Sequence, residues 1–458
     1  MKNESLESAI ARAGSALDLL RNWPARPFTL PIVAEHTDWQ SEQRAWRESV
    51  VLMDQSHHMN DLFLRGDRAV DLLRDLGVNS FRNFGPGHAK QYVVTNHDGF
   101  YIADVVLTHL PDGTLNMVGA KVAMDWVRYH GKVGGYGVEF EFDPNSAARE
   151  PGRPPKQYRY EVQGPFAKDL MSKVLGQPVP DVKFFHMVEI EIAGHAVQVL
   201  RHGMAGQPGF ELFGPWEQGE QVRQALLDAG REFELRQVGS KAYSTANLES
   251  GWIPPTVPAI FTGEQSRGFR EWLVPTGLGA LGGSLSRDTI EDHYLTPYDL
   301  GYDKIVSFDH DFVGHEALEK MAAEPPRRRV SLIWESEDVT GTIMGSLFNS
   351  RQLPAKLVNL PKARYATYQQ DAVLNSGELV GVSMDAGYVA NERVFLSLAS
   401  VDNAHAEPGT QVTVVWGERP VSSKPGVEPH RQVEVRATVA PAPLDAFARD
   451  QYRLNRRA

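Results

Sequence analysis

Hydrophobic positions along this chain follow two different spacings, which predicts a mixture of helices and strands. Apolar residues recur at the spacing of an amphipathic helix in residues 68–76 and 216–229. β-Branched and aromatic residues form strand-like runs at residues 91–95, 101–107 and 189–200. Helical and strand-like segments alternate, which indicates a mixture of α and β structure, and we assign the fold class α+β.

Two stretches rich in proline, glycine or charge divide the chain. Residues 145–156 have the composition of a surface loop, which we place at a joint between two subdomains. A second boundary is expected near residues 322–329, separating a region 1–325 from a domain 326–458. Beyond it, short strand-like runs separated by turn residues predict a small β-barrel, at residues 330–334, 381–389, 393–398 and 411–416.

The segment 241–254 predicts a short helix with a defined end. Residues 242–250 are compatible with a helix, Gly251 suits the left-handed position after the last turn, and Pro254 forbids continuation. Helical spacing places Tyr243, Asn247 and Gly251 on one face.

The same segment resembles the A-A-R-D-x-L-R-L-E-A-G helix of the glycine-cleavage aminomethyltransferase family. Residues 248–251, Leu-Glu-Ser-Gly, take the place of L-E-A-G, and Tyr243 stands at the family's first arginine. A longer block at residues 282–318 resembles the family's G-x-D-I-x-E-x-x-x-P-x-E-A-G-L-G-x-x-V followed by D-F-x-G-x-E-A-L. Shorter blocks resemble D-x-S-H-M at residues 53–59 and G-G-x-x-D-D at residues 98–104.

The resemblance covers residues 45 to 420 and implies both a fold and a co-substrate. It implies an aminomethyltransferase-type fold, in which two mixed α/β subdomains and a C-terminal β-barrel surround a central folate cleft. The region 1–325 would hold the folate site, and 326–458 would be the barrel. The implied partners are tetrahydrofolate and a small-molecule substrate.

Composition excludes several other functions. The chain has 458 residues, 42% of them hydrophobic, which is enough for two or three domains. It contains no cysteine, and this excludes disulfides, zinc–thiolate sites, iron–sulfur clusters including Rieske centres, and thiolate-ligated haem. Its 15 histidines show no metal-ligand spacing such as H-E-x-x-H, so we expect no metal site.

Charge and hydropathy bear on partners and location. A net charge of −11 disfavours nucleic acid as a partner. The first residues are charged instead of forming an apolar leader, and no apolar run approaches the ~20 residues that span a bilayer. We therefore expect a cytoplasmic protein without a membrane partner, and an oligomer is possible.

Two carboxylates are candidates for folate contact. Strand alternation places Asp104 on an apolar face, where an unpaired carboxylate would cost on the order of several kcal/mol and needs a partner. By resemblance, Asp104 matches the second aspartate of G-G-x-x-D-D, which lies beside the reactive folate nitrogen, whereas Ala103 replaces the first. Glu211, in a block that resembles G-Y-T-G-E-D-G-x-E-I, takes the place of the glutamate that binds the pterin. Without the family, Asp104 could be a structural carboxylate and Glu211 a solvated side chain.

Tyr243 and Trp252 carry the information about the substrate. A branch of the family that demethylates methoxylated aromatic acids places tyrosine at the first arginine and tryptophan nine residues later, as here. The chain therefore most resembles tetrahydrofolate-dependent vanillate, syringate or 3-O-methylgallate O-demethylases. Methyl loss from an aryl ether expels a phenolate, and a tyrosine of pKa near ~10 is matched to protonate it. Tyr243 is the candidate acid, unless it is simply a packed aromatic, and Trp252 would stack on the arene or contact folate.

Four further side chains complete the predicted site. Gln55 and His58 would bind the phenol or ether oxygens, with His57 beside them, although adjacent histidines more often cap a turn. Lys121 is the predicted cation for the substrate carboxylate, and Arg128 is the alternative.

Three functions remain open from the sequence. The favoured one is aromatic O-demethylation with tetrahydrofolate as methyl acceptor. The second is methyl or aminomethyl transfer from another donor, such as a sulfonium, a glycine derivative or a chlorinated methoxybenzoate. The third is a folate-binding iron–sulfur assembly factor, whose motif contains a cysteine that this chain lacks.

Overall fold

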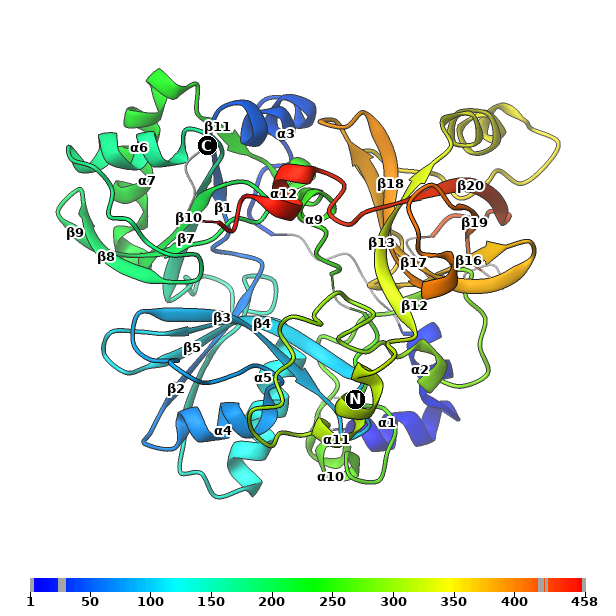
Figure 1. Ribbon diagram of the computed structural model, residues 1–458, viewed down its shortest axis with the longest axis horizontal. Coiled ribbons are helices and arrows are strands. Elements are labelled where there is room, and N and C mark those ends of the chain that lie inside the picture. The colour runs from blue at the N-terminus through cyan, green and yellow to red at the C-terminus, as the bar shows by residue number, and fades with distance from the viewer. Residues whose placement is uncertain (1–3, 24–29, 255, 419–423, 425–426, 455–458) are drawn as a thin grey trace.

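The computed structural model describes residues 4–23, 30–254, 256–418, 424 and 427–454. Figure 1 shows two sheets on the left and below, and a barrel on the right, arranged around the middle of the molecule. In this described part of the chain, no helix combines the length and apolar character needed to cross a bilayer.

The first sheet has six strands in the order β11-β1-β7-β10-β9-β8. Helices α6 (Ala167–Leu175) and α7 (Gly219–Gly230) pack on one face, against Tyr158, Tyr160 and Val162 of β7. Helix α3 (Trp39–Glu48) packs against β1 and β11. The strands are β1 (Val51–Asp54), β7 (Gln157–Gln163), β8 (Met187–Ile192), β9 (His195–Arg201), β10 (Gly209–Pro215) and β11 (Arg236–Val238).

The second sheet has five antiparallel strands in the order β3-β4-β5-β2-β6. Residues 144–156 join its strand β6 to β7 of the first sheet. The strands are β2 (Asn60–Arg65), β3 (His88–Thr95), β4 (Tyr101–His109), β5 (Leu115–Gly119) and β6 (Glu139–Asp143). The helices that share its core are α1 (Leu6–Ala13), α2 (Ala16–Arg21), α4 (Ala69–Leu76), α5 (Lys121–Val133) and α10 (Arg267–Trp272).

The C-terminal strands close into a barrel, which confirms the predicted fold. The ring runs β17-β16-β19-β20-β13-β18 and closes because β18 also pairs with β17. Helix α11 (His315–Ala322) precedes the first barrel strand. The strands are β13 (Arg327–Trp334), β16 (Asp371–Asn375), β17 (Glu378–Val389), β18 (Val394–Asp402), β19 (Gln411–Trp416) and β20 (Val433–Ala440), with the short β14 (Lys362–Ala363) on β17.

The structure divides two of the predicted elements. The run at 189–200 is a hairpin of β8 and β9, because Ala193 and Gly194 have φ of 52° and 78° and form a two-residue turn. The helix predicted at 242–250 is two short helices, α8 (Ser240–Tyr243) and α9 (Ala246–Ser250).

The break between α8 and α9 has a chemical cause. The Ser244 hydroxyl donates to the carbonyl of Lys241 at 2.6 Å, and the Thr245 hydroxyl donates to that of Ala242 at 2.7 Å, so side chains replace part of the helical ladder. Gly251 has φ of 70°, as predicted for the residue that ends the helix.

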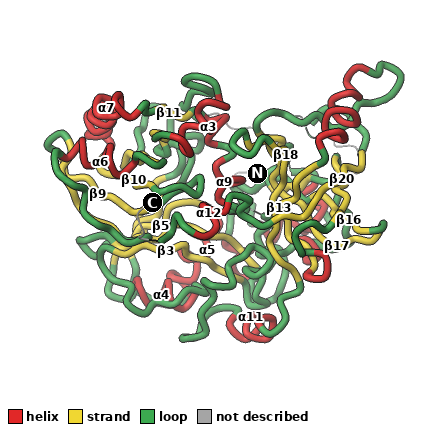
Figure 2. The backbone as a smooth tube through the Cα atoms, turned by 45° about the horizontal axis from the view of Figure 1, so that its top comes forward, coloured by secondary structure: helices red, strands yellow, loops and turns green. Residues whose placement is uncertain are grey.

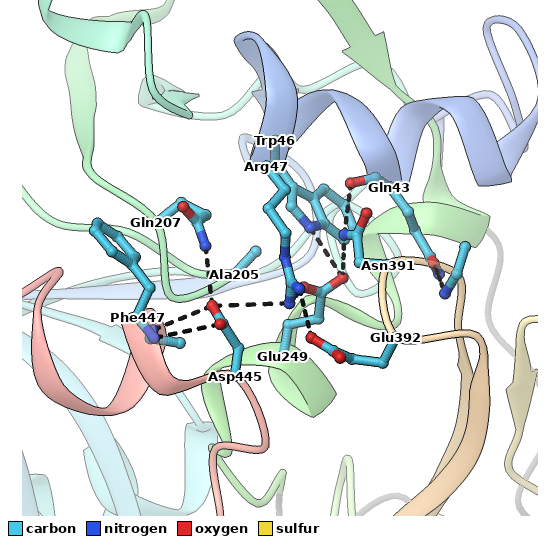
Figure 3. Close-up of polar contacts among 12 residues, drawn as sticks. Gln43, Trp46, Arg47, Ala205, Gln207, Glu249, Asn391, Glu392, Asp445 and Phe447 are labelled. Atoms are coloured by element: carbon cyan, nitrogen blue, oxygen red, sulfur yellow. Dashed lines mark hydrogen bonds and ion pairs between the residues drawn. The ribbon is translucent and has the colours of Figure 1, made fainter. Parts of the chain in front are cut away.

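Helix α9 lies between the first sheet and the barrel (Figure 2), and its Glu249 ties several segments together. The buried Glu249 carboxylate accepts hydrogen bonds from Trp46 at 3.0 Å, Asn391 at 2.7 Å and Arg47 at 2.7 Å (Figure 3). Arg47 also pairs with Glu392 and, at 3.8 Å, with Asp445 before the C-terminal helix α12 (Ala446–Asp450). The glutamate of the L-E-A-G-like block is therefore structural.

Candidate active site

Tyr243 and His58 meet at the centre of the predicted site. The Tyr243 hydroxyl is hydrogen-bonded to Nε2 of His58 at 2.9 Å, and the two rings meet edge to face. Tyr243 ends α8, whereas His58 lies in the turn after β1, so α3, which packs on both α8 and β1, fixes their approach. Nδ1 of His58 is buried without a hydrogen-bond partner in the described residues.

Burial keeps both groups neutral at neutral pH. It lowers the pKa of His58 to about 4. Burial, followed by the nearby carboxylates of Glu161 and Glu211, raises the pKa of Tyr243 well above its ordinary value, and the Gln55 amide opposes that shift. The pKa near ~10 assumed from the sequence is thus wrong for Tyr243. The tyrosine is a persistent hydrogen-bond donor and a weaker acid than an ordinary phenol.

Gln55 lies beside this pair and is hydrogen-bonded to Glu161, a residue that no sequence motif indicates. Gln55 Nε2 donates to Oε2 of Glu161 at 2.6 Å, and the amide N–H of Met204 donates to Oε1 at 2.7 Å. Burial raises the pKa of Glu161 to about 8. The available signal was the alternation in β7, where Tyr158, Tyr160 and Val162 enter the core and the intervening residues are polar.

Glu211 lies on β10 next to the same group and is paired with a cation. Its Oε1 accepts a hydrogen bond from Nη1 of Arg159, and Nη2 of Arg159 also bonds Asp61 at 3.2 Å. Arg159 and Glu211 are both buried, and the guanidinium lies 4.8 Å from the centre of the Phe213 ring. In the described part of the chain, no hydrogen bond reaches Oε2 of Glu211, which leaves this oxygen as an acceptor.

Asp104 and Trp252 form a second polar group, on the side of the five-stranded sheet. Asp104 accepts from Tyr101, from Gln91 at 2.7 Å and from the indole N–H of Trp252 at 3.2 Å. Burial raises the pKa of Asp104, and these donors oppose the rise. Gln91 also donates a hydrogen bond to the hydroxyl of Tyr302 at 3.0 Å. Asp104, which needs partners because it lies on an apolar strand face, therefore has them.

Three predicted residues have partners outside these two groups. His57 bonds Ser146 through Nδ1 at 2.8 Å. Lys121 and Arg128 both bind Asp125, at 2.5 Å and 3.1 Å. Lys121, the cation predicted to bind a substrate carboxylate, is thus already paired with Asp125 of the same helix.

Tetrahydrofolate is the co-substrate implied by the resemblance, and the donors and acceptors around Glu211 fit it. The pterin presents paired N–H donors, which a carboxylate oxygen such as Glu211 Oε2 can accept. In the described residues, three buried polar atoms near this carboxylate or its strand partner Glu161 lack partners: Oε1 of Gln55, Nδ1 of His58 and Nδ1 of His202. Glu211 raises the pKa of both His58 and His202 against the larger effect of their burial, so it lies near both. Unpartnered polar atoms around a half-paired carboxylate are typical of a ligand site.

Known proteins resemble this chain in sequence and in fold. It is 44% identical over 454 residues to syringate O-demethylase of Sphingobium sp. (strain NBRC 103272 / SYK-6), and the alignment covers 98% of each chain. It is 27% identical to sesamin methylene transferase of Sinomonas sp. (strain No.22), over 82% of each. Its fold is similar to that of glycine cleavage system aminomethyltransferase T from Bartonella henselae, with a TM-score of 0.59, 18% identity and coverage of 94% of this chain and 97% of that one.

The family model called the GCVT N-terminal domain matches residues 24–255. This range includes Gln55, His58, Glu211 and Tyr243, and therefore the centre of the site described above. The chain belongs to the GCVT family, to which the aminomethyltransferase-type fold and the motifs around Tyr243 had pointed.

Proposed function

We propose that this protein is an O-demethylase that moves the methyl group of a methoxylated aromatic acid, such as syringate, vanillate or 3-O-methylgallate, to N5 of tetrahydrofolate. The observation that carries the proposal is the hydrogen-bonded pair of Tyr243 and His58, next to the half-paired Glu211. The 44% identity to a syringate O-demethylase over nearly the whole chain supports an aromatic donor. The products are the free phenol and 5-methyltetrahydrofolate.

Tyr243 would stabilise the leaving group. When the bond between the ether oxygen and the methyl carbon breaks, its electron pair stays on the aryl oxygen, which gains negative charge. A neutral tyrosine hydroxyl can donate a hydrogen bond to that oxygen, and its raised pKa keeps the proton on Tyr243 until the charge has formed. His58, neutral and bonded to the same hydroxyl, would orient it.

Three residues would hold the co-substrate. Glu211 would accept the pterin N–H groups through Oε2, while Arg159 keeps Oε1 in place. Asp104 and Trp252, joined at 3.2 Å, would line the folate side of the cleft. Tetrahydrofolate would supply a nitrogen lone pair that accepts the methyl group.

Lys121 is the proposed partner of the substrate carboxylate, with Arg128 as the alternative. Asp125 holds both cations on α5, and this limits their reach. His57 would help to shape the pocket from the turn after β1, where Ser146 fixes its ring. We propose a cytoplasmic location, with small molecules as the partners and an oligomer possible.

The direct test is to incubate the protein with tetrahydrofolate and, separately, syringate, vanillate and sesamin. We expect 5-methyltetrahydrofolate and the demethylated phenol from a methoxylated acid, both measured by liquid chromatography and mass spectrometry. Sesamin is included because a relative that is 27% identical is a sesamin methylene transferase. Turnover of sesamin or of a non-aromatic donor, without turnover of any methoxylated acid, would refute the proposed function.

A further inference from the structure

Arg329 is a half-buried arginine that forms no ion pair within the described residues. It lies in β13, and its guanidinium donates to the carbonyl of Gly251 at 2.8 Å and to the carbonyl of Ala442 at 3.5 Å. Burial lowers the pKa of Arg329, and the nearby Tyr302 opposes that shift. A cation that is partly withdrawn from water is stabilised by an anion beside it. Arg329 is therefore suited to bind an anionic group of a ligand.

The Arg329 guanidinium lies beside the residues proposed to line the folate side of the site. Gly251, which accepts its shorter hydrogen bond, directly precedes Trp252, and the indole N–H of Trp252 bonds Asp104. Tyr302, which is close enough to affect the pKa of Arg329, is linked to Asp104 through one amide side chain. An anion held by Arg329 would thus lie next to the Asp104 group.

A second arginine, Arg453, is held in place by aromatic rings of the C-terminal segment and the first sheet. Figure 1 shows this segment crossing from the barrel, past α9, toward the first sheet. Nε of Arg453 donates to the Tyr452 hydroxyl at 3.1 Å, and the guanidinium lies 5.4 Å from the centre of the Tyr452 ring and 5.8 Å from that of Phe184. Arg453 is exposed and has no carboxylate partner in the described part of the chain. Its charge is therefore available to a ligand.

Arg453 lies near both sides of the candidate active site. The Phe184 ring, on which it rests, contacts His202 with ring centres 6.2 Å apart. Burial lowers the pKa of His202, while the charge of Glu211 opposes that shift and the charge of Arg453 adds to it. Arg453 also adds to the lowering of the Arg329 pKa. It is therefore close to Arg329 and to the surroundings of Glu211, the proposed partner of the pterin.

Folate has the chemistry that these two arginines would recognise. Its pterin is neutral near pH 7, and its negative charge is carried by the two carboxylates of the glutamate tail, beyond the p-aminobenzoyl ring. A guanidinium binds a carboxylate through two parallel hydrogen bonds. Two arginines without acidic partners match the two carboxylates of the tail, whereas a methoxylated aromatic acid has one.

We propose that Arg329 and Arg453 bind the glutamate tail of tetrahydrofolate, with Arg329 on the inner carboxylate and Arg453 on the one nearer to solvent. The assignment rests on the proposed use of tetrahydrofolate and adds the residues that hold the end opposite the pterin. The acid group of a methoxylated aromatic substrate has the same carboxylate chemistry, so the experiment distinguishes the two sources.

The tail site is tested by calorimetry with tetrahydrofolate and with tetrahydropteroate, which lacks the glutamate. Wild type should bind tetrahydrofolate about 10-fold or more tightly than tetrahydropteroate. Arg329→Gln, which keeps an amide donor for Gly251, should remove most of this difference, and the exposed Arg453→Gln should weaken binding of tetrahydrofolate about 2- to 5-fold. Neither variant should change Kd for tetrahydropteroate. The matched control is Arg328→Gln, at the neighbouring exposed arginine that pairs with Glu407, and it should bind both ligands like wild type.

The outcomes separate the tail site from the proposed function. Equal affinity of wild type for the two ligands would overturn the tail site and leave the proposed function standing, whereas binding of neither would refute both. An equal loss of affinity for both ligands in Arg329→Gln and Arg453→Gln would also overturn the tail site. A higher KM for syringate in these variants, with an unchanged Kd for tetrahydrofolate, would assign the arginines to the substrate instead. If Arg329→Gln does not fold, Arg453→Gln still decides.

Discussion

The hydroxyl of Tyr243 and Nε2 of His58 lie 2.9 Å apart, although the two residues are separated by 185 positions in the chain. Replacing Tyr243 by phenylalanine removes the donor and leaves the ring. Because the loss of one such donor typically lowers kcat by about 10²- to 10³-fold, we expect a fall of that size, with a smaller change in KM.

The matched control for this prediction is Tyr158→Phe. The Tyr158 hydroxyl is also buried, in the core beneath β7, and has no hydrogen-bond partner in the described residues. Its removal should leave kcat unchanged. Full turnover by Tyr243→Phe would exclude the leaving-group role and keep the family assignment.

Asp104→Asn should weaken binding of tetrahydrofolate. The substitution replaces a carboxylate that accepts three hydrogen bonds with an amide whose NH₂ group faces the same donors, so the position of Trp252 is disturbed. We expect Kd, measured by calorimetry, to rise about 10-fold or more, since a donor left unpaired typically costs about 1–3 kcal/mol. Asp98→Asn, an exposed aspartate in the same block, serves as the control and should bind like wild type.

Lys121→Ala tests the proposed carboxylate contact. If Lys121 binds the acid group, KM for syringate should rise about 10-fold, while KM for the corresponding methoxyphenol without a carboxylate should not change. Arg128→Ala is the companion variant, because Arg128 shares Asp125 with Lys121. An equal rise for both substrates would place Lys121 in a structural role.

Arg47→Ala should destabilise the junction of Figure 3. Removing Arg47 leaves the buried Glu249 carboxylate without its cation, and breaking a buried pair from one side typically costs about 3–5 kcal/mol. Urea unfolding measures this loss. Arg328→Ala, at an exposed pair with Glu407, should cost at most about 1 kcal/mol, and a similar loss in both variants would contradict the prediction.

His293→Asn should make the protein less sensitive to acid. Burial lowers the pKa of His293 to about 4, whereas the unfolded chain has the ordinary value of 6.5. Between these two pH values the unfolded state binds more protons, so His293 reduces stability as the pH falls, by up to about 3 kcal/mol. Asparagine keeps a donor for Gln370, which His293 contacts at 2.6 Å.

The measurement is the difference between wild-type and variant free energies of unfolding at pH 7 and pH 4.5. The free energy of unfolding of the variant should rise relative to that of wild type as the pH falls. Glu249 and Asp371, whose pKa values are raised to about 7, have the opposite pH dependence, but they are present in both proteins and cancel in the difference. A difference that does not vary with pH would contradict the prediction.

The sequence was sufficient for the parts of the fold that local periodicity and turn chemistry determine. The barrel strand at 411–416 matches β19, and Gly251 has the left-handed conformation expected of it. The break between α8 and α9 was missed because helical compatibility was read from each residue alone, while the hydroxyls of Ser244 and Thr245 act on carbonyls three positions earlier.

The site was only partly predictable, because its electrostatics depend on neighbours that are remote in sequence. Gln55, His58 and Tyr243 were named from motifs, but nothing in the chain order places Glu161 opposite Glu211 or gives Arg159 to Glu211. The raised pKa of Tyr243 follows from that arrangement, so an ordinary phenol was the natural assumption from sequence. Likewise, Asp125 became relevant to Lys121 only once α5 was known to begin at Lys121.

The break at Ser244 and Thr245 divides residues 240–250 into two short helices with different contacts. α8 presents Tyr243 to His58, while α9 anchors Glu249 in the junction with α3 and the barrel. In the described residues, the hydrogen-bond partners of Glu249 are Trp46, Arg47 and Asn391, and Tyr243 bonds none of them. New methyl donors can be sought by varying α8 and the turn after β1 while the sequence of α9 is kept constant.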